Sequence, residues 1–77
     1  MPHEVRLPKL SPSMKEGIVV QWLVHEGDAV SSGQPLVQIE SDKAVIDIEA
    51  PAAGRLVRVV QPVGSRVPVG QLLAVIE

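Results

Sequence analysis

One lysine between two predicted strands is the strongest candidate for chemistry in this 77-residue sequence. Lys43 lies between Asp42 and Ala44, and segments rich in Val, Ile and Leu stand on both sides of it. The ε-amine of a lysine can be acylated, which removes its positive charge. A lysine at a hairpin tip is more often only a solvated charge, so the role of Lys43 depends on the elements that position it.

Other kinds of site find little support in the sequence. There is no cysteine, which excludes disulfides and thiolate metal sites, and His3 and His25 lack metal-ligand spacing. Neither a nucleophile–base pair nor a phosphate-binding loop appears. The formal charge of −2 does not suit a nucleic-acid binder. No apolar run approaches the ~18 residues of a membrane span. We expect a non-catalytic domain with no metal, nucleic-acid or membrane partner.

The sequence repeats itself at an offset of 37 positions. Residues 16–40 align without a gap on residues 53–77, and three of the nine identical pairs are glycines. Equivalent glycines imply equivalent turns, because glycine supplies backbone angles with positive φ. Two similar halves related by a quasi-twofold axis are therefore expected. The identical pairs are Gly17/Gly54, Val20/Val57, Gly27/Gly64, Val30/Val67, Gly33/Gly70, Gln34/Gln71, Leu36/Leu73, Ile39/Ile76 and Glu40/Glu77.

Each half is predicted to be a series of strands. Residues 18–24 alternate in polarity, and residues 55–61 follow the same pattern. In the first of these segments Val20, Trp22 and Val24 are expected to share the face that packs inside. No apolar stripe at helical spacing persists, so the prediction is an all-β flattened barrel or sandwich of two facing sheets. Further strands are predicted at 4–7, 36–40, 44–49 and 72–77, with short ones around Val30 and Val67.

The symmetry of the halves fails first at the connection into Gly17. Nine residues separate Leu7 from Gly17. Only five separate their counterparts, Ile48 and Gly54, so the first half carries a longer loop at 9–15. This loop is either a tolerated surface insertion or a recognition element.

The second failure of the symmetry is the connection that contains Lys43. Glu40 leads through Ser41 into the next strand, whereas the sequence stops at the equivalent Glu77. Two-residue hairpins usually place Asn-Gly or Asp-Gly in a type I′ turn. The tip here contains no glycine, so we expect a type I turn with Ser41 at its first position. Acidic side chains are expected to ring the lysine, namely Glu40, Asp42, Asp47 and Glu49.

These segments resemble a known family. Residues 40–44, Glu-Ser-Asp-Lys-Ala, resemble the lipoylation motif of lipoyl domains in 2-oxo acid dehydrogenase complexes, with Asp-Lys-Ala as the diagnostic core. Residues 7–14, Leu-Pro-Lys-Leu-Ser-Pro-Ser-Met, followed by Glu-Gly two positions on, resemble the start of pyruvate dehydrogenase-type acyltransferase lipoyl domains. Residues 20–27 and the Ala-Pro pair before Gly54 also fit. The match covers residues 1–77, which are expected to form a single domain.

The resemblance implies two four-stranded antiparallel sheets and lipoic acid in amide linkage to Lys43 at a hairpin tip. It implies a carrier that takes an acyl group from a thiamin-diphosphate 2-oxo acid decarboxylase and delivers it to coenzyme A at the acyltransferase core. Dihydrolipoamide dehydrogenase would reoxidise the arm, and a lipoate-attaching enzyme would load it. The isolated domain is expected to be a monomer. With no targeting segment visible, the expected location is the bacterial cytoplasm or the mitochondrial matrix.

Several other residues are candidates for recognition. Asp42 and Ala44 are expected to shape the turn or to be read by a partner. Glu40 has a repeat twin in Glu77, so part of its role is structural. The long loop is the hypothesised surface for the decarboxylase, and its candidate residues are Leu10, Ser11, Met14 and Lys15.

Two alternative functions remain open. A biotin carrier domain shares the fold and also modifies a hairpin lysine, but it typically has Met on both sides of that lysine, whereas this chain has Asp42 and Ala44. An unmodified β-barrel adaptor would instead bind through a sheet edge or an apolar patch.

Overall fold

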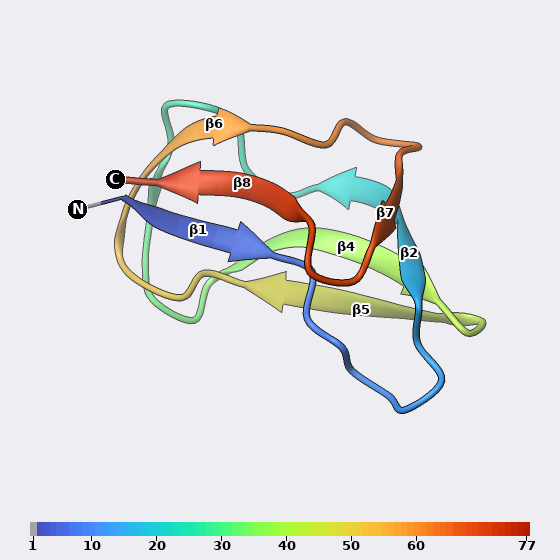
Figure 1. The fold of residues 1–77 in the computed structure, drawn as a ribbon. Helices are drawn as coiled ribbons and strands as arrows, with labels where there is room; N and C mark the ends of the chain where they lie inside the picture. Colours follow the sequence, from blue (N-terminus) through green and yellow to red (C-terminus); the bar gives the residue numbers. More distant parts are fainter. Residues whose placement is uncertain (1) are drawn as a thin grey trace.

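Eight strands form two antiparallel sheets in the computed structural model, which describes residues 2–77 (Figure 1). The strand orders are β1-β8-β6-β3 and β5-β4-β2-β7. The predicted all-β fold is confirmed, and each predicted long strand is found to within two residues at either end. The strands are β1 (His3–Arg6), β2 (Glu16–Trp22), β3 (Ala29–Val30), β4 (Pro35–Ser41), β5 (Ala44–Glu49), β6 (Gly54–Val59), β7 (Arg66–Pro68) and β8 (Leu72–Ile76).

The two sheets have the same plan, which confirms the quasi-twofold symmetry. Exchanging β1 with β5, β2 with β6, β3 with β7 and β4 with β8 converts one sheet order into the other. Each half of the chain supplies two strands to each sheet, so neither half can complete a sheet by itself. Within residues 2–77 the two halves therefore share one core.

The strand β2 contains a bulge that changes which residues face the core. The pairing of β2 with β4 skips Val20, and the pairing of β6 with β8 skips its twin Val57. An extra residue in one strand shifts the inside–outside alternation by one position. As a result Val19 is buried, with 1% of its surface exposed, while Val20 is 41% exposed. The prediction that Val20 faces the core is wrong because it assumed an uninterrupted strand.

The core is almost entirely aliphatic. Leu36 and Leu73 are fully buried. Each is an extra residue in its strand: Leu36 of β4 has no pairing partner on β5, and Leu73 of β8 has none on β1. Trp22 is only partly buried, and its indole N–H donates to the carbonyl of Gln61 at 2.7 Å. Among residues 2–77, no buried side-chain nitrogen or oxygen lacks a hydrogen-bond partner. This apolar packing gives the hairpins a rigid base.

Glycine is required where β2 lies against β4. A Cβ on Gly17 would collide with Ile39 Cγ2 and would lie 3.4 Å from the carbonyl oxygen of Glu40. Glycine is required at its repeat twin Gly54 for the same reason, since a Cβ there would lie 2.6 Å from the carbonyl oxygen of Glu77. The identical glycines of the repeat at these positions therefore serve close strand contact rather than a turn.

The tip of the β4–β5 hairpin lies at the end of the molecule opposite the start of β1 and the end of β8 (Figure 1). The quasi-twofold axis explains this arrangement, because it maps the β4–β5 pair onto the β8–β1 pair. Those two strands run antiparallel, with His3 opposite Ile76. The domain extends 32 × 21 × 17 Å along its principal axes.

The bulge predicts opposite outcomes for two adjacent valines. Val19→Ala should lower the free energy of unfolding by about 2 kcal/mol, because it removes buried methyl groups and leaves a cavity. Val20→Ala should change it by less than about 0.5 kcal/mol, because the side chain is largely exposed. Urea denaturation of both variants measures this, and a larger loss for Val20→Ala would contradict the bulge.

Candidate functional site

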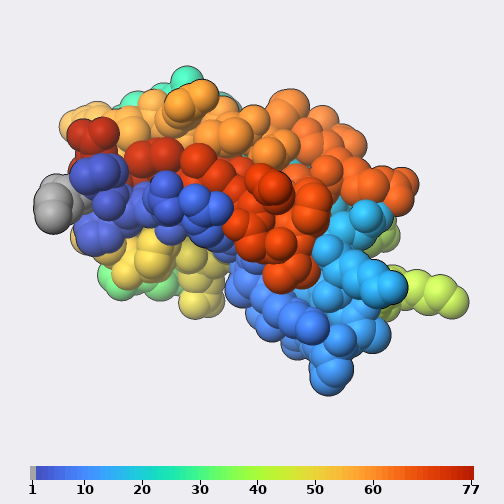
Figure 2. Space-filling view, in the orientation of Figure 1, coloured from blue at the N-terminus to red at the C-terminus, as the bar shows by residue number. Residues whose placement is uncertain are grey.

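Lys43 occupies the tip of the β4–β5 hairpin. The last pair of the hairpin is Ser41 with Ala44, so Asp42 and Lys43 alone form the turn. Figure 2 shows this tip projecting from the body of the domain. Lys43 is exposed, and no ion pair or side-chain hydrogen bond within residues 2–77 holds its amine. The amine is therefore open to the active site of another protein.

Both residues of this turn have a left-handed backbone conformation. The φ angles are 52° for Asp42 and 64° for Lys43, which define a type I′ turn. The predicted type I turn is wrong, because type I would splay two strands that twist to the right, whereas type I′ follows their twist. Asp tolerates this conformation, but for most residues it costs roughly 1–2 kcal/mol. The hairpin thus keeps a lysine where glycine would be less strained.

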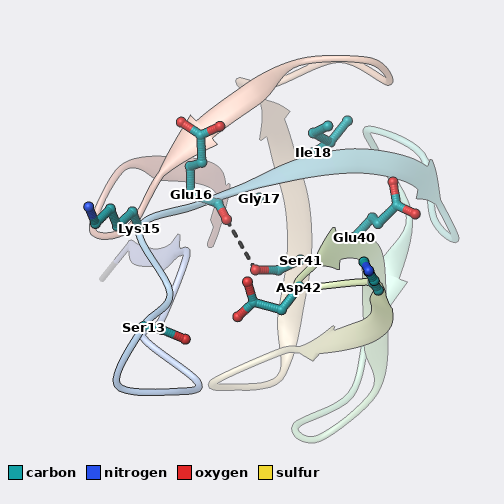
Figure 3. A pocket seen from close by; sticks show the side chains of 9 residues that line it. Ser13, Lys15, Glu16, Gly17, Ile18, Glu40, Ser41 and Asp42 are labelled. Carbon is teal, nitrogen blue, oxygen red and sulfur yellow. Dashed lines mark hydrogen bonds between the residues drawn. The ribbon is translucent and has the colours of Figure 1, made fainter.

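The long loop between β1 and β2 lies beside the hairpin, as expected. The hydroxyl of Ser11 donates to Asp42 Oδ2 at 3.3 Å. The hydroxyl of Ser41 donates to the carbonyl of Glu16 at 3.2 Å, as Figure 3 shows. An open trough separates the end of the loop from the turn, and both Lys15 and Lys43 line it. The two places where the repeat is broken therefore form one surface.

The loop is anchored by residues that point inward. Met14 is only 4% exposed and belongs to the hydrophobic core. Its sulfur accepts a hydrogen bond from the backbone N–H of Leu10 at 3.3 Å. Met14 was predicted as a recognition residue, but its burial makes it the anchor of the loop instead. Leu10 is 51% exposed and Lys15 is also exposed, so both present side chains to solvent.

Only part of the expected acidic ring surrounds the lysine. Glu40 and Asp42 line the same trough as the lysine. Asp47 and Glu49 instead line a separate groove between the edge strands β1 and β5. Asp47 also accepts a hydrogen bond from Gln38 at 3.3 Å. The predicted ring is incomplete because Asp47 and Glu49 are four and six positions after Lys43, and an extended strand carries them away from the turn.

Two contacts of the site carry no signal in the sequence. Ser11 and Asp42 are 31 positions apart, and Ser41 and Glu16 are 25 positions apart. Only the folded arrangement of the loop and hairpin brings these pairs together. Within residues 2–77 there is no group of three or more His, Cys, Asp or Glu side chains that could hold a metal ion. No helix in the described chain is long and apolar enough to cross a membrane.

The fold and the displayed lysine define a domain of the biotin–lipoyl class. The chain belongs to this family, whose model, described as "Biotin-requiring enzyme", matches residues 3–76. A fragment of the Kluyveromyces lactis urea carboxylase has the same fold, with a TM-score of 0.87 at 22% identity. That match covers 100% of this chain and 6% of the carboxylase.

Within the family, the predicted resemblance to lipoyl domains is confirmed. The solution structure of the lipoyl domain of the Azotobacter vinelandii 2-oxoglutarate dehydrogenase complex is 31% identical, with a TM-score of 0.78. The match covers 96% of this chain and 94% of that domain.

Two curated relatives are components of pyruvate dehydrogenase complexes. The dihydrolipoyllysine-residue acetyltransferase component of Zymomonas mobilis is 47% identical over 97% of this chain. The mitochondrial protein X component of Chaetomium thermophilum is 46% identical over 91%. This chain spans 17% and 16% of the lengths of these two relatives.

The left-handed turn makes a testable prediction about stability. Lys43→Gly should raise the free energy of unfolding by about 1 kcal/mol relative to Lys43→Ala, because glycine removes the Cβ that opposes positive φ. The two variants lack the same amine, so their difference isolates the backbone. Urea denaturation measures it, and equal stabilities would show that the turn is not left-handed.

Proposed function

We propose that Lys43 carries lipoic acid in amide linkage and that this lipoyl domain is the carrier module of a 2-oxo acid dehydrogenase acyltransferase. The observation that carries the proposal is the exposed amine of Lys43 at the apex of a left-handed, two-residue turn. Asp42 and Ala44 beside it favour lipoyl over biotin, since biotin carriers typically have methionines at these positions. The names of the curated relatives support the same choice.

The site fits a covalently attached arm. The amine of Lys43 has open space around it, and the trough beside the turn is open to solvent. During attachment the unprotonated amine attacks the carboxyl carbon of lipoic acid, activated by ATP, so that an amide forms and the activating group leaves. When bound, the group supplies a disulfide that accepts an acyl group with two electrons, and a dithiol that is reoxidised. The domain contributes a rigid base and an exposed exit for the arm.

The proposed partners follow from this role. They are a 2-oxo acid decarboxylase, the acyltransferase core, dihydrolipoamide dehydrogenase and a lipoate-attaching enzyme. Tethering the domain near these enzymes would raise the effective concentration of the arm at each active site. The tip of the β4–β5 hairpin lies at the end of the domain opposite the start of β1 and the end of β8, so it would face away from segments joined there (Figure 1). The proposed location is the bacterial cytoplasm or the mitochondrial matrix, and a bacterial and a mitochondrial relative support it.

The loop beside the hairpin is proposed as the surface that the decarboxylase recognises. Leu10 is exposed next to the hairpin, in a small notch that Ser11, Ala44 and Ile46 also line. Lys15 lies across the trough from the turn. Apolar side chains that gather on a surface can form a contact for a partner. Met14 contributes by fixing the loop from inside.

Intact mass spectrometry tests the attachment site. Incubation with lipoic acid, ATP and a lipoate ligase should add one lipoyl mass to the wild-type domain and none to Lys43→Arg, because only Lys43 stands at the turn. Lys15→Arg is the matched control and should be modified like the wild type, although it lines the same trough. A biotin mass after incubation with biotin and its ligase, or no gain with either, would overturn the proposal.

Reductive acylation tests the recognition surface. Leu10→Thr on the lipoylated domain should lower kcat/KM for the decarboxylase about tenfold, because it removes an exposed apolar contact. Lipoylation itself should be unchanged. Val57→Thr is the matched control, since Val57 is 41% exposed but lies on β6, in the other sheet. Equal rates for the two variants would remove the loop from the proposed surface.

A further inference from the structure

We infer that Ser11 and Ser41 are positioning residues that hold the Asp42-Lys43 turn in the orientation in which the lysine is modified. The inference rests on the proposed attachment of lipoic acid at Lys43. Its basis is a pair of hydrogen bonds: the hydroxyl of Ser11 connects the long loop to the turn, and the hydroxyl of Ser41 connects the hairpin end to the start of β2. Neither serine contacts the reacting amine, so both act through the backbone of the turn.

The end of the hairpin lacks a third strand. The strand β2 pairs with β4 only as far as Ile18 opposite Glu40. Beyond that point β2 pairs with β7, and the Ser41–Ala44 pair of the hairpin has no strand-pairing partner on the β2 side. A two-stranded ribbon is marginally stable by itself, so its last pair and its turn need other support.

The hydroxyl of Ser41 supplies part of that support. It donates to the carbonyl of Glu16 at 3.2 Å, where a ladder hydrogen bond would otherwise continue. The last pair of the two strands is Ile18 with Glu40, and the missing Cβ of Gly17 leaves room for Ile39 and for the carbonyl of Glu40, so that β2 lies close to β4 here. The acceptor is itself fixed, because Glu16 pairs with Pro68 and its carboxylate binds Arg66 at 2.7 Å.

The hydroxyl of Ser11 supports the turn from the loop. It donates to Asp42 Oδ2 at 3.3 Å, and Asp42 is the first of the two left-handed residues. The side of the loop that holds Ser11 is anchored by the buried Met14. The two hydrogen bonds therefore join the hairpin end to two other parts of the chain, the start of β2 and the loop that Met14 anchors to the core. Figure 3 shows Ser41 and Asp42 directed toward the side of the trough formed by the loop.

Loss of both hydroxyls should allow the turn to sample other orientations. The apparent affinity of an enzyme for a protein falls with the fraction of molecules in the competent state. An attachment enzyme that must reach Lys43 at a fixed place should therefore show a higher KM for the domain. Its kcat should be unchanged, because the amine and the chemistry are the same once the complex has formed.

The experiment compares the double variant Ser11→Ala/Ser41→Ala with Ser13→Ala. Ser13 lies on the same loop, lines the same trough and makes no side-chain hydrogen bond within residues 2–77. The double variant should raise the KM for lipoate ligase about fivefold at unchanged kcat. Its backbone amide order parameters should fall at residues 42–44, whereas Ser13→Ala should match the wild type in both measurements. Ser11→Thr/Ser41→Thr keeps both hydroxyls and should restore KM.

The outcomes separate the two proposals. If the wild-type domain accepts no lipoyl group, the proposed function fails and this inference fails with it. If the wild type is modified but the double variant has the KM and order parameters of Ser13→Ala, only the positioning role is overturned. A rise in KM that the threonine variant does not reverse would also overturn it, because the hydroxyls would then not be the cause.

Discussion

The connection between Ser41 and Ala44 is the constraint on which the rest of this site depends. Only two residues join a pair of right-twisted strands, and the type I′ turn that they form has positive φ at both positions. Asp42 and Lys43 accept this conformation in place of the glycine that would relieve it. The lysine therefore lies at the tip of the hairpin, beyond its last strand pair. The strain and the exposure are two results of one short connection.

The symmetric core and the asymmetric candidate site have different roles in this domain. The repeat supplies equivalent strands, equivalent bulges at Val20 and Val57, and close-contact glycines at Gly17 and Gly54. These features set the stability and the shape of both halves alike. The long loop and the hairpin turn are where the halves differ, and they meet on one surface. The strands of the scaffold occur twice, but the turn with Lys43 occurs once. The domain therefore displays a single lysine on a symmetric scaffold.

The sequence predicted the sheets well because local signals agree there with the fold. Glycines and apolar segments that recur at an offset of 37 positions predicted the strands and their symmetry. The side-chain alternation failed at Val20, because a bulge is a property of strand pairing and leaves no mark on one strand alone. Met14 was misplaced for a similar reason, since a single methionine in a polar loop does not reveal that it packs into the core.

The site was predicted in part. The position of Lys43 at a hairpin tip agrees with the prediction, because the motif and the break in the repeat coincide there. The hydrogen bonds donated by Ser11 and Ser41 were not predicted, because each joins residues that only the folded chain brings together. The turn type was wrong because residue preferences favoured negative φ, whereas the twist of the strands requires positive φ. Tertiary geometry overrode local preference at the residue that carries the proposed function.

The most direct test of this account is the backbone φ of Asp42 and Lys43 in solution. Amide-to-α-proton couplings and the strong intraresidue contacts typical of left-handed residues determine it by NMR. The account predicts positive φ at both residues, before and after modification of the lysine. Negative φ at both would mean a type I turn, and it would contradict the claim that a strained two-residue connection displays Lys43.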